Sequence, residues 1–385
     1  MKEPLIIDIE CTTSNKGNPF DQTNKMVCFG IKNSYGIDIG YNLTPRFIRL
    51  LQQTINRAEF LVGFNIKFDL HWLRTIGIDI SKVKVWDCQL GAFILENQSK
   101  PYPSLNDAAM TYGFEPKLDI VKTEYWDKGI DTDKIPEQIL SDYLQQDLTL
   151  TERVFLEQRK QFAPNGKAWM KSTLFNLQCA DLLVLQEMEW NGMVFNTEKA
   201  RKRAKEIETE IDEITKTLMG YIGNVPCNLN SGDHISCILY GGTIVETVRI
   251  PVGYFKTGQK VGEVRYKKIY KEYELPRLTT PIEGTEVKNK EGYWLVNDTV
   301  LRKLKLSKEA KTVVELLGRY TTLDKLRGTY LLGWSKLIDK MNWEKDMLHG
   351  NLNQAVAVTG RLTSTKPNMQ NPDPTTKTYC ESRYV

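Results

Sequence analysis

The sequence predicts an α/β domain over residues 1–163, followed over residues 164–385 by a mainly helical portion with a β-rich insertion. In the first part, short apolar runs that end in charged residues alternate with helical patterns, which is typical of a layered α/β domain. The Ala-Pro-Asn-Gly stretch at residues 163–166 breaks the last of these helical patterns. A chain of 385 residues also exceeds the usual size of one domain, so we expect at least two.

Strands and helices account for most of the first part. The strands are short, buried-type runs rich in β-branched and aromatic residues. The first helix begins with Thr-Pro, a typical helix start. The expected strands are Leu5–Ile9, Met26–Ile31 and Phe60–Phe64, and the expected helices are Thr44–Arg57, Lys67–Ile76 and Ile135–Gln161.

The second part begins with helices and contains one stretch of a different kind. Trp169–Trp190 is apolar at helical spacing, and Thr197–Gly220 is a long charged helix with few breakers. Residues 241–294 are rich in Val, Ile, Tyr, Gly and Lys in short alternating runs, which predicts a β-rich insertion. Helices return over residues 299–339, and the tail from Gly360, punctuated by Pro, Asn and Asp, is expected to be loop.

The charge is distributed unevenly along the chain. Residues 1–160 carry 19 Lys and Arg against 22 Asp and Glu, whereas residues 161–385 carry 33 against 26. An acidic first part and a basic second part suit a carboxylate metal site followed by a phosphate-binding surface. Ordinary variation in surface charge explains these numbers equally well.

Composition also narrows the cellular setting and the kind of metal site. No apolar run approaches the roughly 18 residues of a membrane span, and the start has no signal-peptide core, so we expect the cytoplasm. Seven scattered cysteines without a CxxC pair indicate reduced thiols. With three histidines far apart in sequence, a histidine-based metal site is not expected.

Carboxylates occur at three places where the predicted elements can present them together. Asp8 and Glu10 lie two apart at the end of the first strand, so they point to the same face. Asp69 follows in the run Gly-Phe-Asn-Ile-Lys-Phe-Asp, where a strand leads into a helix. Tyr143 and Asp147 are four apart on the last predicted helix and share a face there. Each pattern alone also fits solvent-exposed acidic residues.

In this order, Asp-Ile-Glu, Gly-Phe-Asn-Ile-Lys-Phe-Asp and Tyr-Leu-Gln-Gln-Asp resemble the three motifs of the DEDD exonuclease superfamily, tyrosine branch. The resemblance implies an RNase H-like domain over residues 1–163, a mixed sheet flanked by helices, with 3′→5′ exonuclease activity. All five positions of the family's site are filled, and the implied catalytic residues are Asp8, Glu10, Asp69, Tyr143 and Asp147.

The resemblance also implies two divalent metal ions, Mg²⁺ or Mn²⁺. Carboxylates without His or Cys are the ligands that such hard cations prefer, and two ions about 4 Å apart suit phosphodiester hydrolysis. By resemblance, Asp8, Glu10 and Asp147 hold the first ion, Asp8 bridges to the second, and Asp69 holds the second through its waters. Tyr143 would orient the attacking water, and Asn65 would contact the terminal nucleotide of a single strand. We interpret Asp87, in Val-Trp-Asp-Cys, as structural.

The second part resembles the opening portion of family A DNA polymerases, the DNA polymerase I family. Residues 175–196 and 228–240 are similar to the family's first landmarks, and residues 316–330 are similar to the thumb helices that grip primer–template DNA. The resemblance implies DNA contacts at Lys325, Arg327 and Thr329, and phosphate contacts of this kind position a duplex without reading its sequence.

The most specific match to that family is Thr-Gly-Arg-Leu-Thr-Ser at residues 359–364, followed by Pro-Asn-Met-Gln-Asn-Pro at residues 367–372. Arg361 can donate to minor-groove acceptors that every base pair presents, so it would sense pair geometry without sequence preference. Asn368, Gln370 and Asn371 would contact template and sugar. The basic β-rich insertion at 241–294 resembles one found in phage replicative members, and it either lies along DNA or is a solvated surface.

We therefore expect the N-terminal portion of a phage-like replicative polymerase that binds single-stranded and primer–template DNA. Beyond Val385 the family continues into the catalytic palm strands and the fingers, so we expect no primer extension by this chain alone. A second polypeptide would carry them if the protein is naturally split. If the protein is phage-encoded, the host bacterial cytoplasm is the expected location. Two alternatives stay open: a stand-alone RNA-processing exonuclease of the DEDD type, and a non-catalytic DNA-binding polymerase subunit.

Overall fold

The computed structural model describes residues 2–41 and 43–383. The chain forms two compact units. The first, which we name the sheet unit, comprises Met1–Thr197 together with Trp334–Val385, and the second, the helical unit, comprises Glu198–Gly333. The expected boundary at residue 163 lies inside the sheet unit, because the helix after it packs on the same core. The division into an exonuclease portion and a polymerase portion stays a prediction.

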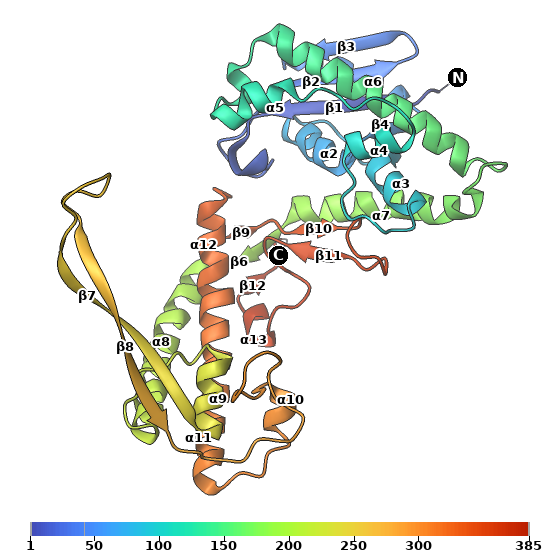
Figure 1. Ribbon diagram of the computed structural model, residues 1–385. Helices are drawn as coiled ribbons and strands as arrows, with labels where there is room; N and C mark the ends of the chain where they lie inside the picture. Colours follow the sequence, from blue (N-terminus) through green and yellow to red (C-terminus); the bar gives the residue numbers. More distant parts are fainter. Residues whose placement is uncertain (1, 42, 384–385) are drawn as a thin grey trace. The chain divides into compact units, whose positions relative to one another are not determined.

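The sheet unit is built on a mixed five-stranded sheet in the order β3-β2-β1-β4-β5 (Figure 1). The central strand β1 pairs antiparallel with β2 and parallel with β4. β2 pairs antiparallel with β3, and β4 pairs parallel with β5. The strands are β1 (Leu5–Cys11), β2 (Met26–Asn33), β3 (Gly36–Gly40), β4 (Leu61–Gly63) and β5 (Val85–Asp87).

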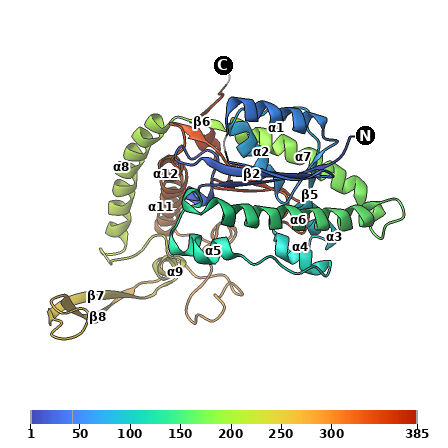
Figure 2. The same cartoon turned by 90° about the horizontal axis from the view of Figure 1, so that it is seen from above.

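Helices cover both faces of this sheet, as the view from above shows (Figure 2). One core cluster joins odd-numbered residues of β1 to helices α1, α2 and α7, and the other joins Ile6 of β1 to α4, α5 and α6. The helices are α1 (Pro45–Arg57), α2 (Ile66–Thr75), α3 (Cys88–Leu95), α4 (Leu105–Thr111), α5 (Ile120–Glu124), α6 (Glu137–Phe162) and α7 (Ser172–Asn191). Short 3₁₀ turns lie at Ser14–Lys16, Trp126–Lys128, Thr132–Lys134 and Trp169–Lys171.

Two small sheets complete the sheet unit. One has the order β12-β6-β9, and the other pairs β10 with β11. Their strands are β6 (Met193–Phe195), β9 (Met347–Leu348), β10 (Asn351–Asn353), β11 (Thr363–Thr365) and β12 (Cys380–Glu381), with helix α13 (Pro374–Lys377) between the last two. The expectation of loop from Gly360 onward was therefore wrong in part. The two strands in this stretch, β11 and β12, are only three and two residues long and mostly polar, so they lack the alternation that predicts a strand.

The helical unit combines helices with one long hairpin. Its core joins α8, α9 and α11 to the base of the hairpin. Residues 276–297 are irregular apart from one bridge between Glu286 and Trp294. The elements are α8 (Thr197–Tyr221), α9 (Gly232–Tyr240), β7 (Gly242–Tyr254), β8 (Val264–Leu275), α10 (Asp298–Leu301), α11 (Lys308–Lys325) and the π-helical turn η5 (Leu326–Leu331), after which α12 (Leu332–Lys340) returns the chain to the sheet unit.

The β-rich insertion expected over residues 241–294 is strand only as far as Leu275, so its second part was predicted wrongly. The other predicted strands and helices are confirmed to within a few residues. Capping explains where some of them begin. Thr44 accepts a hydrogen bond from the Phe47 amide, and Pro45 occupies the first turn of α1. Ser307 caps α11 in the same way through the Ala310 amide. None of the helices in the described residues is long and apolar enough to span a bilayer.

Candidate active site

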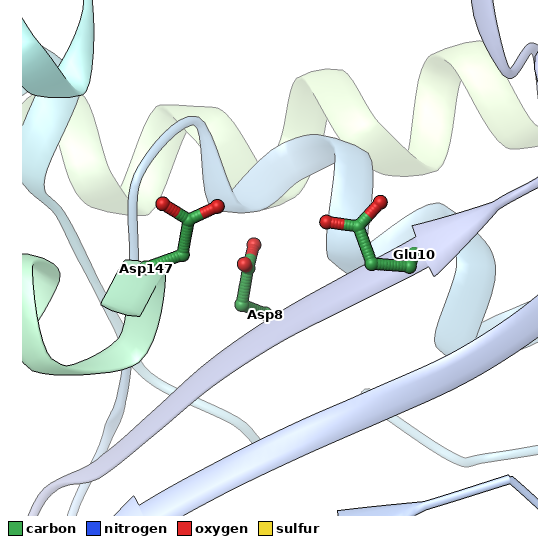
Figure 3. A group of neighbouring side chains, drawn as sticks. All are labelled: Asp8, Glu10 and Asp147. Atoms are coloured by element: carbon green, nitrogen blue, oxygen red, sulfur yellow. The ribbon is translucent and has the colours of Figure 1, made fainter. Parts of the chain in front are cut away.

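Three carboxylates from distant parts of the sequence meet in the sheet unit. Asp8 and Glu10 lie on β1 and Asp147 lies on α6, and one ligand oxygen from each falls within 4.8 Å of the others. Figure 3 shows the three side chains next to one another, with Asp8 between the other two. Among the described residues, this is the group of acidic, His or Cys side chains close enough to hold one ion.

Alternation along β1 places the two strand carboxylates on the face that α6 covers. Ile6 packs in the cluster that contains the apolar residues of α6, and Asp8 and Glu10 follow it at steps of two. Gly30 of β2 pairs with Asp8, and a Cβ at Gly30 would come within 2.6 Å of Leu148 of α6. Glycine at this position therefore lets α6 approach the sheet closely enough for Asp147 to reach Asp8.

Burial and like charge set the electrostatics of this site. Burial raises the pKa of Asp8 well above its usual range, and the charge of Asp147 raises it further. Burial likewise raises the pKa of Glu10, with Asp8 the next largest contribution. Carboxylates forced together in this way favour either a bound proton or a bound cation.

Asp69, on α2, is buried beside this group but is not among the three. Burial raises the pKa of its carboxyl, and the charge of Asp8 is the next largest cause, which places the two near each other. In the part of the chain that the structure describes, Oδ1 of Asp69 and Oδ1 of Asp147 are buried without a hydrogen-bond partner. Buried, unpartnered carboxylate oxygens among raised pKa values are the donor set that a divalent cation satisfies, so these four residues fit the expected metal ions.

A lysine that the sequence analysis did not identify completes the site. Nζ of Lys117 donates to Tyr143 Oη at 2.7 Å and to Asp147 Oδ2 at 2.6 Å, and its side chain is 13% exposed. Burial raises the pKa of the Tyr143 phenol, so the phenol keeps its proton at neutral pH. Because the phenol oxygen accepts from Lys117, its own O–H points elsewhere and is available as a donor.

Asn65 and Asp87 lie beside the start of α2 in different roles. Asn65 has a left-handed backbone (φ 59°) at the N-cap of α2 without a side-chain capping bond in the described structure. Its exposed side chain lines a cavity of about 390 Å³. Asp87 is buried and accepts from the amides of Ile66 and Leu90, both at 2.8 Å. This agrees with a structural role for Asp87, which holds the first residues of α2 and α3.

The expected DNA-binding residues lie in two groups, one in each unit. In the helical unit, Lys325 and Thr329 are exposed near the π-helical turn η5. Arg327 is partly buried and donates to Glu208 at 3.1 Å and to Asp324 at 3.5 Å. In the sheet unit, Arg361, Asn368, Gln370 and Asn371 are all exposed.

The polar residues of the second group stabilise their own loop. The Gln370 amide donates to Asn368 Oδ1, and Gln370 Nε2 donates to the Leu362 carbonyl, both at 3.0 Å. Ser364 is buried, and its hydroxyl accepts from the Met369 amide. These contacts hold the loop after β11 against Leu362 and Ser364, and Arg361 lies just before this strand.

The comparisons with known proteins agree with the resemblance over the second part of the chain. The sequence profile described as DNA polymerase family A matches residues 269–383. The chain is 25% identical over 302 residues to DNA polymerase I of Bacillus subtilis (strain 168), which covers 78% of this chain and 28% of that protein. It is 23% identical over 417 residues to the DNA polymerase of Bacillus phage SP01, covering 95% of this chain and 42% of that protein.

Among solved structures, the fold is similar to the polymerase domain of Pol1 from M. smegmatis, determined in complex with a DNA primer–template and dNTP. The TM-score is 0.64 at 15% identity, covering 97% of this chain and 53% of that chain. The chain spans less than half of the length of either polymerase named above, 28% of the Bacillus subtilis protein and 42% of the phage protein. Residues 269–383 match the model of DNA polymerase family A, and the chain is similar over most of its length to part of polymerases of this kind.

Proposed function

We propose that this chain removes nucleotides from the 3′ end of DNA by metal-dependent phosphodiester hydrolysis, as the proofreading part of a family A DNA polymerase. The observation that carries the proposal is the convergence of Asp8, Glu10 and Asp147, with Asp69 beside them. These four carboxylates would hold divalent ions, which would supply a nucleophile at neutral pH and neutralise charge on the attacking and leaving oxygens.

The remaining residues of the site position the substrate and a water molecule. The protonated Tyr143 phenol donates a hydrogen bond that can orient water, and Lys117 fixes the phenol oxygen. Asn65 presents an unused amide at the cavity wall, where it can contact the terminal nucleotide. Exposed Arg361 and the ordered loop after it suit binding of primer–template DNA, as the family assignment supports.

The first prediction concerns substrate and metal. We expect the purified chain with Mg²⁺ or Mn²⁺ to shorten single-stranded DNA from its 3′ end, and EDTA to stop the reaction. A 3′-labelled and a 5′-labelled oligonucleotide distinguish the direction of attack, and an RNA of the same sequence serves as the matched substrate. Degradation of RNA in preference to DNA would favour a stand-alone RNA-processing exonuclease instead.

The second prediction separates Tyr143 from Lys117 by a double-mutant cycle. Tyr143→Phe should lower the rate by roughly 10²-fold or less, since it removes one positioning hydrogen bond. Lys117→Gln should lower kcat by a similar or smaller factor, with KM nearly unchanged. Lys117→Arg should retain part of the kcat that Lys117→Gln loses. In the Tyr143→Phe background, Lys117→Gln should lose the part of its effect that it exerts through the phenol and keep only the part that it exerts through Asp147. Fully multiplicative losses in the double variant would contradict this arrangement.

A further inference from the structure

The β7–β8 hairpin is an exposed ribbon that the proposed exonuclease chemistry does not use. Its base is anchored, since Ile244 and Leu275 are buried in the core of the helical unit. All residues from Arg249 to Lys268 are exposed, so neither face of this part of the ribbon is covered. Figure 2 shows the two strands leaving their base beside α9 and running out away from α8. A two-stranded ribbon of this kind is only marginally stable by itself in water.

The exposed part of the ribbon is strongly basic. Residues 249–268 contain six Lys and Arg against one Glu. Within the described structure, none of these six side chains forms an ion pair. They are Arg249, Lys256, Lys260, Arg265, Lys267 and Lys268.

The cross-strand pairing shows that the outer charges do not stabilise the hairpin. Near the base, Glu246 lies opposite Lys271, a favourable pair, and Glu246 also accepts from the Tyr273 hydroxyl at 3.0 Å. Farther out, Arg249 lies directly opposite Lys268. Like charges at opposed positions destabilise a hairpin, so this pair suits an anion that binds between them.

Tyrosines flank this basic pair on the same face. Residues two apart on a strand share a face, so Tyr266, Lys268 and Tyr270 line one face of β8 at steps of about 7 Å. Arg249 is on this face too, because it is the cross-strand partner of Lys268. Tyr266 is 54% exposed and Tyr270 is 66% exposed. Exposed aromatic rings beside cationic groups are the combination on which unpaired bases stack while their phosphates are neutralised.

We propose that this face of the hairpin, formed by Arg249, Tyr266, Lys268 and Tyr270, is a binding site for single-stranded DNA. The tyrosines stack on bases, and the two cations contact the phosphates between them. Since stacking on a π-face is open to every base, binding has no sequence preference. Duplex DNA offers phosphates but no free base faces, so the tyrosines favour single strands. The site is separate from the carboxylates of the proposed exonuclease.

The test measures affinity of the full chain for a labelled oligodeoxythymidylate of about 16 nucleotides, the upper end of known site sizes. EDTA is present throughout, so that no exonuclease activity enters the result. Tyr266→Ala combined with Tyr270→Ala should weaken binding about 10-fold or more per ring lost, with the salt dependence unchanged. Tyr35→Ala, which removes a 94% exposed tyrosine from the β2–β3 turn, is the aromatic control and should change nothing.

The charge contribution has its own variant and control. Arg249→Gln combined with Lys268→Gln should reduce the slope of log K against log salt by about 1.4, since each phosphate contact to a single strand contributes about 0.7. Lys267→Gln combined with Lys271→Gln removes two cations from the opposite face of β8 and should reduce the slope by less than half as much. Circular dichroism should confirm that each variant is folded.

Two outcomes would overturn the proposal. If single-strand affinity is the same in the double-tyrosine variant and the wild type, the rings do not stack on bases, and the face belongs to a protein partner. If the double-tyrosine variant loses as much affinity for a blunt duplex of the same length as for the single strand, the hairpin does not select single strands. Neither outcome depends on the exonuclease proposal, because catalysis is absent from the assay.

Discussion

Asp8→Ala should abolish 3′-end degradation almost completely. Asp8 lies between Glu10 and Asp147 in Figure 3, and after burial its charge is the largest cause of the raised pKa of both Glu10 and Asp69. Loss of a ligand shared by both proposed ions removes several kcal/mol of transition-state stabilisation, which corresponds to a rate loss of roughly 10³-fold or more. The measurement is the initial rate of product release from labelled single-stranded DNA at saturating Mg²⁺.

The matched control is Asp38→Ala, which removes an exposed carboxylate from the edge strand β3 of the same sheet. It should leave the rate unchanged. Asp8→Ala should not lower the thermal stability of the metal-free protein, because it removes one of several like charges that repel one another at close range. Retention of more than a small fraction of the rate by Asp8→Ala would show that the exonuclease site has been assigned wrongly.

The sequence predicted the carboxylates of the site because regular elements carry them. The i, i+2 spacing of Asp8 and Glu10 and the i, i+4 spacing of Tyr143 and Asp147 fix their faces once the strand and the helix are known. Neither spacing shows that the strand and the helix meet. That expectation came from the order of the three motifs, and the packing of α6 over β1 beside Gly30 is its structural basis.

Lys117 escaped sequence analysis for a physical reason. It lies in residues 113–119, between α4 and α5, where the chain is neither helix nor strand, so no periodicity assigns its side chain to a face. Its partners Tyr143 and Asp147 follow 26 and 30 residues later. A lysine at such a position is most often a solvated surface residue, and only tertiary structure shows it buried against a carboxylate.

The same limitation applies to the join between α7 and the rest of the sheet unit. Trp169–Trp190 was predicted as an apolar helix, which α7 confirms. Its apolar spacing did not reveal that Glu189, near the end of that helix, is 4% exposed and charged. The partners of Glu189 lie 118 residues or more away, on α2 and at β10. A buried ion-pair network therefore joins residues on the two sides of a domain boundary drawn at residue 163.

This network underlies the largest stability effect that we expect. Glu189 accepts from Lys67 Nζ at 2.6 Å, from His71 Nε2 at 2.8 Å and from the Leu352 amide at 2.6 Å. Burial acts to raise the pKa of Glu189, but the hydrogen bond from His71 and the charge of Lys67 lower the pKa overall. Burial lowers the pKa of His71, so its contact with Glu189 is a neutral hydrogen bond and Lys67 supplies the positive charge.

Glu189→Gln should lower the free energy of unfolding of the sheet unit by about 3–5 kcal/mol, because Lys67, with a 12% exposed side chain, loses its buried counter-charge. Glu187→Gln is the matched control on the same helix. The Glu187 side chain is 53% exposed where it pairs with Arg74, so its loss should cost about 1 kcal/mol or less. Chemical denaturation followed by circular dichroism measures both, with unchanged m-values as the sign of an unchanged unfolded state.

Adding Lys67→Met to Glu189→Gln should recover much of the loss, since the unpaired buried charge is then removed together with its partner. This recovery distinguishes an ion-pair network from mere packing, because a packing defect would grow with the second substitution. Equal midpoints for Glu189→Gln and Glu187→Gln would show that the network does not hold α7 against α2.

The same variants link stability to function. Lys67 lies two residues before Asp69 on α2, so loosening this helix should also weaken exonuclease activity, whereas Glu187→Gln should leave it intact.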